Sequence, residues 1–444
     1  MTTKVKARIK NLFSKGAELQ LPKDGCLPNS KPATIGTGLP HDLLHEIFLD
    51  ISISSPNCFV LYDSLQLLML VCSHWKGIIM TSPLLWTRIT VRSITMPVEN
   101  ECRVLSRFLK LSSGLPLAII YYRAPDKTLD ALMTESHRWK SFLTNTLPDS
   151  RLKSIQHNFP LLEELSGLVS SQSPIEAFKD SPRLGRVCLS FWGDPQKIRI
   201  ILPWDQIQSF ETPKRGPGRD ILQRCSHLYR YALSSTSRTW APGLSVMSPR
   251  IRHTSLRDIS LAWADELNSL ELPALESLEI WDQPDINLFS ILNGFSSRSQ
   301  CSLKSFTVRE LRKVEPTEIV QFFELNPRIF DLSFSLLDVD SENMASLFNI
   351  LSLHKSSLTL IPLLLKLGHL CVGIRRKDME VEYFDHGPLL DMIYSRLIPR
   401  SDAAPLTRLK IRTCSETRTS SIPQIQALWK VERLTFDLEV WGFS

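Results

Sequence analysis

The chain has 444 residues, of which 43% are hydrophobic and 22% are charged, and its formal net charge is +6. This composition is typical of a folded globular protein and excludes a largely disordered chain, a collagen-like fibre and a disulfide-dense scaffold. The nine cysteines are odd in number and include no Cys-x-x-Cys pair, so they predict neither a disulfide framework nor a zinc site. We therefore expect a reducing compartment, the cytoplasm or the nucleus.

The positive charge is concentrated at the start of the chain. Residues 1–37 hold seven cations and two anions, which leaves the rest of the chain with a net charge of only +1. Duplex-binding domains usually carry a basic surface, so a body this close to neutral indicates that nucleic acid is not a partner. Because apolar residues share one helical face among the lysines, an organelle presequence or a membrane-surface helix is an alternative. We favour a disordered basic tail and linker over 1–37.

The first predicted elements lie between residues 38 and 96. Pro40 suits the first position of a helix, and Asp42 places a carboxylate near the positive end of the helix dipole. Apolar residues then recur at helical spacing over 39–51, and a second apolar helix is expected over 65–80. Because a unit of this size is too small to bury all of its apolar side chains, we expect the next domain or a partner to cover part of them.

Three segments of this region follow one another in a recognisable order: LPHDLLHEIF (39–48), LMLVCSHWK (68–76) and SPLLW (82–86). Their order, spacing and residue types resemble the F-box, the three-helix module that docks onto the Skp-type adaptor of cullin-RING ubiquitin ligases. The segment over 104–117 adds a similarity to the F-box proteins of mushroom-forming fungi. The resemblance implies that nine residues dock the adaptor or hold the module together. They are Leu39, Pro40, Leu43, Leu44, Ile47, Phe48, Val71, Trp75 and Trp86.

A short apolar pattern returns from Leu162 onward: apolar, two residues, apolar, one residue, apolar. Copies begin at residues 162, 184, 207, 228, 256, 275, 303 and 329, with later copies at 406 and 431. The mean interval over the first eight copies is about 24 residues, within the range of leucine-rich repeats. Each repeat offers one short strand that buries its side chains against its neighbours, so the strands stack into a solenoid. Helical spacing over 286–295 and 316–325 predicts helices on the convex side.

The predicted fold class is therefore α/β: a three-helix F-box over 38–96, then an irregular leucine-rich-repeat-like solenoid of short parallel strands and helices over 161–444. Residues 97–160 are expected to connect the two. The most apolar window, 358–374, is interrupted by Pro362, Lys366 and His369. It is also shorter than the roughly 20 residues of a membrane span, so we expect buried core and no membrane partner.

The sequence contains no phosphate-binding loop and no G-x-S-x-G nucleophile elbow. His41 and His45 lie one helical turn apart and could share a metal ion, but no third ligand is near, so a solvated helix face is favoured. The basic loop over 214–219 could contact phosphate or act as a localisation signal, although a surface turn is favoured. We therefore expect neither catalysis nor a metal ion nor a cofactor.

Two tryptophans are candidates for binding a target. Trp192 and Trp281 each fall just after an apolar triplet, and rigid aromatic residues are common hot spots of interfaces. Core packing is the favoured interpretation of both. The sequence thus predicts a substrate-recognition adaptor of a cullin-RING (SCF-type) ligase, with the Skp-type adaptor, a cullin and an unknown protein target as partners. The alternative is a non-catalytic repeat scaffold whose F-box does not recruit a ligase.

Overall fold

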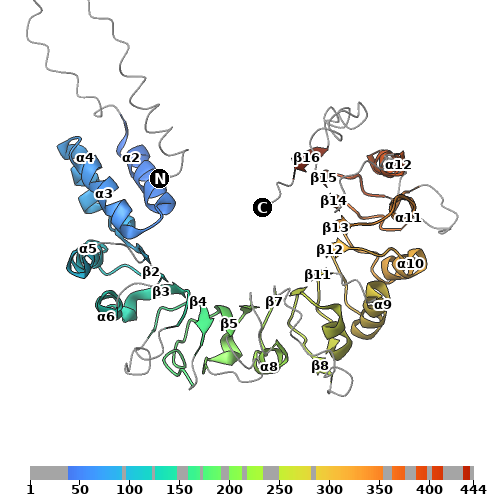
Figure 1. Cartoon of the computed structure of the whole chain (residues 1–444), viewed down its shortest axis with the longest axis horizontal. Coiled ribbons are helices and arrows are strands. Elements are labelled where there is room, and N and C mark those ends of the chain that lie inside the picture. The colour runs from blue at the N-terminus through green and yellow to red at the C-terminus, as the bar shows by residue number, and fades with distance from the viewer. Residues whose placement is uncertain are drawn as a thin grey trace, which may run out of the picture. The chain divides into compact units, whose positions relative to one another are not determined.

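A computed structural model of the chain describes thirteen stretches of residues. They are 39–92, 97–122, 126–147, 159–170, 174–191, 200–212, 218–233, 250–281, 287–353, 363–375, 387–397, 403–413 and 434–440. The chain divides into two compact units: unit 1 extends to Pro203 and unit 2 begins at Trp204 (Figure 1). The basic tail expected over 1–37 lies outside the described residues.

Unit 1 opens with three α-helices, α2 (His41–Ser54), α3 (Cys58–Met69) and α4 (Ser73–Thr81), followed by the 3-10 helix η1 (Pro83–Trp86). Pro40 directly precedes α2 as its N-cap residue. The expected single helix over 65–80 ends within one residue of the end of α4, but its start and its continuity are wrong. Asn57 starts α3 earlier, because its side chain accepts a 2.8 Å hydrogen bond from the Val60 amide. Extended backbone at Cys72 (φ −163°, ψ 166°) then separates α3 from α4.

Five parallel strands follow in unit 1. They are β1 (Arg88–Arg92), β2 (Leu117–Tyr122), β3 (Trp139–Thr144), β4 (Glu164–Val169) and β5 (Arg186–Phe191), hydrogen-bonded in chain order. Helix α5 (Val98–Leu111) connects β1 to β2, and α6 (Asp126–Met133) with η2 (Ser136–Arg138) connects β2 to β3. In Figure 1 α5 and α6 cover the same side of these strands. Strand–helix units of the sheet therefore also occupy the segment 97–160.

Unit 2 repeats this arrangement with nine parallel strands in chain order. They are β6 (Ser209–Thr212), β7 (Arg230–Leu233), β9 (Asp258–Leu261), β11 (Ser277–Trp281), β12 (Ser305–Leu311), β13 (Asp331–Leu337), β14 (His369–Arg375), β15 (Arg408–Thr413) and β16 (Thr435–Val440). Strands β8 (Ile251–Arg252) and β10 (Leu270–Glu271) form a separate pair. The helical segments are η3 (Trp204–Gln206), α8 (Gly218–Arg224), η4 (Ala264–Ser269), α9 (Leu288–Ser299), α10 (Pro316–Leu325), α11 (Ser341–Leu351) and α12 (Gly387–Leu397). Figure 1 shows α9 to α12 along one side of the strands.

The predicted α/β class with short parallel strands and helices is confirmed. The apolar triplets coincide with β4, β5, β6, β7, β9, β11, β12, β13 and β15, and the two expected helices are α9 and α10. The short pair β8 and β10 lies outside the predicted triplets, and so does β14. The triplet of β14, Leu367, Leu370 and Val372, lies inside the window that we expected to be core. Helix α11 and the residues after it lengthen this repeat, so the regular interval is lost there.

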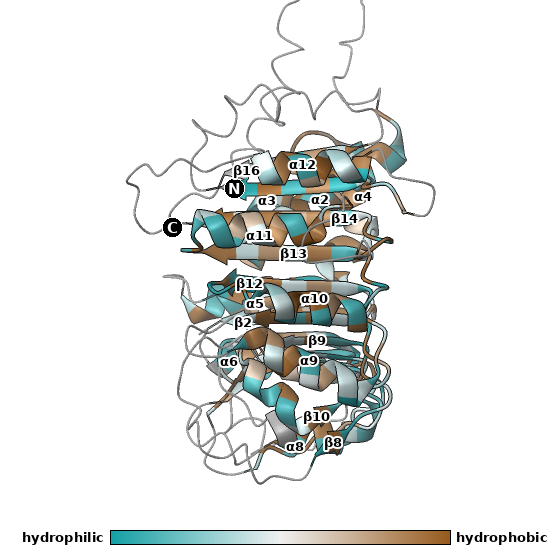
Figure 2. Ribbon diagram, turned by 90° about the vertical axis from the view of Figure 1, so that its right-hand side faces the viewer, coloured by the Kyte–Doolittle hydropathy of each residue, from teal (hydrophilic) through white to brown (hydrophobic). Residues whose placement is uncertain are grey.

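The core of unit 2 lies between the strands and their helices. Every second residue of a strand is buried on the helix side, as with Leu278 and Ile280 of β11. The Phe306 ring of β12 lies 4.6 Å from the Phe322 ring of α10, measured between centroids. Hydrophobic residues recur along β13, α10 and α11 in Figure 2. The other side of the strands carries no helix and is turned away from this core. We call it the outer face.

Candidate interaction surfaces

Exposed apolar side chains are concentrated on the three-helix module. Among the described residues thirteen large hydrophobic side chains are exposed, and eight of these lie between Leu39 and Leu84. The eight are Leu39, Leu43, Ile53, Leu67, Leu70, Val71, Met80 and Leu84. Scattered apolar residues are ordinary on a protein surface, but a concentration of this kind marks an interaction site.

Five of these side chains lie at one end of the module. The rings of His41 and His74, at the starts of α2 and α4, are 6.4 Å apart, which brings these two helix ends together. Leu70 and Val71 directly precede α4, and Leu39 and Leu43 stand at the start of α2. We call Leu39, Leu43, Leu67, Leu70 and Val71 the apolar patch. Its most exposed members are Leu70, at 81%, and Leu67, at 68%.

The nine residues implied by the F-box resemblance divide into three groups. Leu39, Pro40, Leu43 and Val71 are exposed, Ile47 and Trp75 are half-buried, and Leu44, Phe48 and Trp86 are buried. Leu67, Leu70, Met80 and Leu84 are exposed as well, although none of them is among the nine. Leu67 and Leu70 lie where α3 ends, and the sequence was interpreted there as one continuous helix.

The buried and half-buried members hold the module together and join it to α5. Trp75 packs edge-on against Phe48 with ring centroids 5.4 Å apart, which fastens α4 to α2. Trp86 donates a 3.0 Å hydrogen bond from Nε1 to the carbonyl oxygen of Ile79. Its ring also lies 5.0 Å from the ring of Phe108 on α5. The apolar patch is therefore presented by a rigid support.

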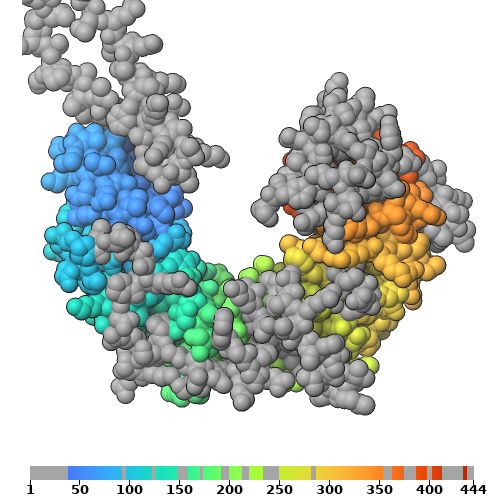
Figure 3. Space-filling model, viewed as in Figure 1, coloured from blue at the N-terminus to red at the C-terminus, as the bar shows by residue number. Residues whose placement is uncertain are grey.

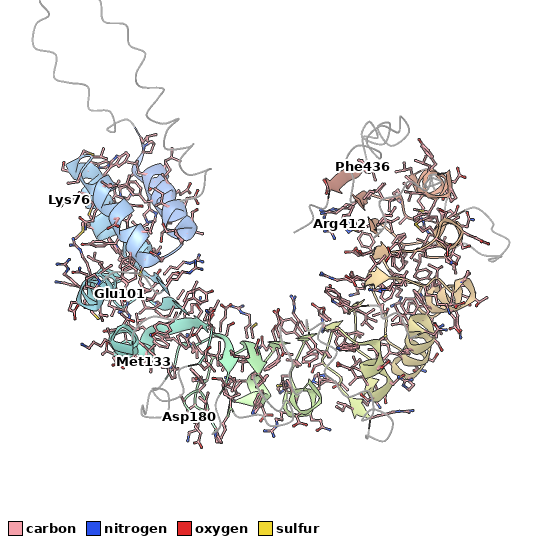
Figure 4. All side chains as sticks on the ribbon, viewed as in Figure 1. Lys76, Glu101, Met133, Asp180, Arg412 and Phe436 are labelled. Carbon is pink, nitrogen blue, oxygen red and sulfur yellow. The ribbon has the colours of Figure 1, made fainter. Side chains whose placement is uncertain are left out.

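Charged side chains are also exposed on the module. Asp42, Glu46, Asp63 and Lys76 are exposed, and Figures 3 and 4 show the module from one side, with Lys76 labelled on α4. His41 is likewise exposed, with Nδ1 3.5 Å from a carboxylate oxygen of Asp42. Among the residues with described positions, no group of three His, Cys, Asp or Glu side chains is arranged to hold a metal ion.

The described cysteines include several thiols that are poorly suited to act as nucleophiles. Burial raises the pKa of Cys58 above its usual range, and the nearby Glu101 carboxylate, on α5 in Figure 4, adds to this shift. Burial also raises the pKa of Cys225 to about 12 and that of Cys301 to about 11. The thiolate is the reactive form, so these three groups are largely protonated, and therefore weak nucleophiles, near neutral pH.

The outer face of β11 carries the tryptophan that the sequence singled out. Ser277, Glu279 and Trp281 alternate with buried residues, so Trp281 is half-buried on the outer face, and the favoured core interpretation is wrong for it. The guanidinium of Arg309 lies 5.3 Å from the centre of the Trp281 ring and also pairs with Glu279. Trp192 and residues 214–217 of the basic loop lie outside the described residues.

In the described parts of the chain, no helix combines the length and the hydrophobicity needed to cross a membrane. A comparison with protein-family models and with curated proteins finds no match to this chain. The case for a function therefore depends on the surfaces described above and on the sequence resemblance.

Proposed function

We propose that this protein is a non-catalytic substrate-recognition adaptor of a cullin-RING (SCF-type) ubiquitin ligase. In this proposal the α2–α4 module is an F-box that docks onto a Skp-type adaptor, and through it a cullin, while the repeats hold a protein target. The apolar patch is the observation that carries the proposal, because it lies on the segment whose sequence resembles the F-box. The odd number of cysteines and the lack of a Cys-x-x-Cys pair agree with a cytoplasmic or nuclear location.

The patch has the physical character of a docking site. Removing a leucine side chain from water is worth about 1.5–3 kcal/mol, so one such residue changes a dissociation constant by roughly 10- to 150-fold. A rigid support keeps the cost of ordering small when the partner binds. Outside the module, the structure describes five other exposed large hydrophobic residues, spread over residues 201–394, and of these only Leu325 and Phe330 are near each other in the sequence. The five are Ile201, Tyr229, Leu325, Phe330 and Tyr394.

The adaptor would act by proximity. One chain would hold the target on its repeats and the ligase core on its module. The effective concentration of the target near the transferred ubiquitin would therefore rise. No residue of this chain needs to take part in the chemistry.

Co-purification with a Skp-type adaptor tests the proposal. The substitutions Leu43→Asp and Leu70→Asp change exposed positions of the patch, whereas Leu44 is buried and its substitution would unfold the module. We expect the wild type to retain the adaptor, the double variant to release it, and the control Leu325→Asp, an exposed leucine of unit 2, to retain it. Equally negligible recovery with all three proteins would overturn the proposal and favour a repeat scaffold that recruits no ligase.

A further inference from the structure

The outer face of unit 1 carries large apolar side chains on three neighbouring strands, β2 to β4, where a free sheet face is normally polar. Strand β2 buries Leu117, Ile119 and Tyr121 on the helix side, and its alternate residues, Ile120 and Tyr122 among them, are half-buried on the outer face. Parallel pairing places Thr90, Ile120, Leu143, Ser166 and Cys188 in one row across β1 to β5. Leu168 of β4 extends the apolar surface beside this row.

Unit 2 provides an internal comparison. Its equivalent row, across β9 to β15, consists of Ser260, Glu279, Thr307, Ser333, Cys371 and Lys410. These positions are small or polar, as expected of a strand side that faces water. Within this row, large aliphatic side chains therefore occur in unit 1 and not in unit 2, where Trp281 of β11 lies beside the row.

Two exposed cations border this row at its β1 end. Arg88 and Arg92 are exposed, and within the described ranges neither has an ion-pair partner. The guanidinium of Arg92 lies 5.4 Å from the centre of the Tyr122 ring. On other strands the outer-face arginines are neutralised: Arg186 pairs with Glu164, Arg230 with Asp258, Arg309 with Glu279 and Arg408 with Asp437.

We propose that the outer face of β1 to β5 binds an extended, acidic and apolar peptide segment of a partner protein. Carboxylates of the peptide lie over β1, against Arg88 and Arg92, and aliphatic or aromatic side chains follow over β2 to β4. Neighbouring strands are about 4.8 Å apart, so the row spans about 19 Å, the length of about six residues of extended chain. The basic segment 1–37 of this chain is excluded as the occupant by its charge. This inference rests on the proposed function in one respect, that the peptide belongs to a ligase target.

Degenerate peptide pools test the proposal with the full-length protein. The probe is a fluorescein-labelled pool with two Asp or Glu positions followed by Leu, Ile, Val, Phe or Tyr alternating with Ser. Comparison pools replace the acidic positions by Lys, or the apolar positions by Ser. By fluorescence anisotropy we expect the acidic and apolar pool to bind at least about tenfold more tightly than either comparison pool. We also expect its binding to weaken when NaCl rises from about 50 to about 200 mM.

Two double variants locate the site. Ile120→Thr with Leu143→Thr keeps residues suited to strands and is expected to weaken binding at least about tenfold. Arg88→Glu with Arg92→Glu is expected to reverse the preference, so that the Lys pool binds more tightly than the acidic pool. A protein that merely unfolds cannot show this reversal. The control, Arg328→Glu with Lys366→Glu, changes two exposed cations of unit 2 and is expected to bind as the wild type does.

Equal binding of all pools, or binding that neither double variant changes, would overturn the proposal. The adaptor test is separate, because Leu43→Asp with Leu70→Asp changes the apolar patch and is expected to leave peptide binding intact. A variant that loses adaptor recovery but keeps peptide binding therefore tests the apolar patch alone. A variant that loses peptide binding but keeps adaptor recovery tests the outer face alone.

Discussion

The guanidinium of Arg396 donates a 2.6 Å hydrogen bond from Nε to the carbonyl oxygen of Leu351. Arg396 is fully buried on α12, and Leu351 is the last residue of α11, where carbonyl groups lack partners within the helix. The two Nη atoms donate to the carbonyls of Leu363 and Leu364, at 3.0 Å each. One side chain thus provides hydrogen-bond donors for three backbone carbonyl groups of the preceding repeat.

The same arrangement recurs at other junctions. Arg138 of η2 donates to the carbonyls of Leu109 and Leu115, at the end of α5 and just beyond it. Arg298 of α9 donates to the carbonyl of Leu267 in the preceding helical segment, η4. A buried arginine at a helical junction is therefore a stabilising device that both units use.

Arg396→Met tests this device. The substitution keeps most of the side-chain volume but removes three hydrogen bonds to buried carbonyls, so we expect a loss of about 3 kcal/mol of stability. Urea denaturation followed by circular dichroism measures it. The control Arg408→Met removes an exposed ion pair with Asp437 and should cost less than about 1 kcal/mol. Equal effects of the two substitutions would contradict the interpretation.

The two tryptophans of the module should respond differently to substitution by phenylalanine. Trp86→Phe removes the hydrogen bond to Ile79 and leaves space in a closed core, which predicts a loss of about 1–3 kcal/mol. The Nε1 of Trp75 is buried and has no hydrogen-bond partner in the described structure. Trp75→Phe keeps a ring against Phe48 and removes this unpaired donor, so it should cost less. The thermal unfolding temperatures of the two variants rank their stabilities. A greater loss of stability in Trp75→Phe than in Trp86→Phe would contradict the roles assigned to these two residues.

Stability should fall as the pH rises toward 8 because of Glu266. Burial raises the pKa of this carboxyl to about 8, and the charge of Asp265 adds to the shift. Between its ordinary pKa and about pH 8, Glu266 is protonated in the folded state but ionised in the unfolded state. The free energy of unfolding is therefore highest below the ordinary pKa and decreases as the pH rises to about 8.

Glu266→Gln removes this dependence. We expect the variant to match the wild type near about pH 5 and to exceed its stability by about 1–3 kcal/mol near pH 9. Urea midpoints across this range measure the difference. Glu324→Gln, at an exposed position of α10, serves as the control. A constant difference at all pH values would refute the role assigned to Glu266.

Gly368 is required by the ring of Phe330. A Cβ atom at Gly368 would lie 2.2 Å from Cε2 of that ring, which also packs against His369 with ring centroids 4.6 Å apart. Gly368→Ala should therefore cost about 1–3 kcal/mol. Adding Phe330→Ala should recover part of this loss in a double-mutant cycle. Gly77→Ala, where no atom lies within 4 Å, should instead stabilise α4 by up to about 1 kcal/mol.

The sequence by itself determined which segments form the regular repeats of the chain. An apolar triplet such as Leu275, Leu278 and Ile280 predicts a strand with one buried side, and the structure places β11 there. Helical spacing likewise predicted α9 and α10. These predictions succeed because alternation within a strand and recurrence within a helix are local properties, and neighbouring repeats bury the same positions in each copy.

Tertiary structure alone decided which residues of the module face water. Leu43 and Leu44 are adjacent and chemically identical, yet Leu43 is exposed and Leu44 is buried, because packing of α2 against α4 and η1 selects one of them. The same holds for the break at Cys72, which exposes Leu70 and Val71, and for the outer face of β2, where both sides of the strand are apolar. In each case contacts between segments distant in the sequence determine what is buried, and a local pattern does not contain that information.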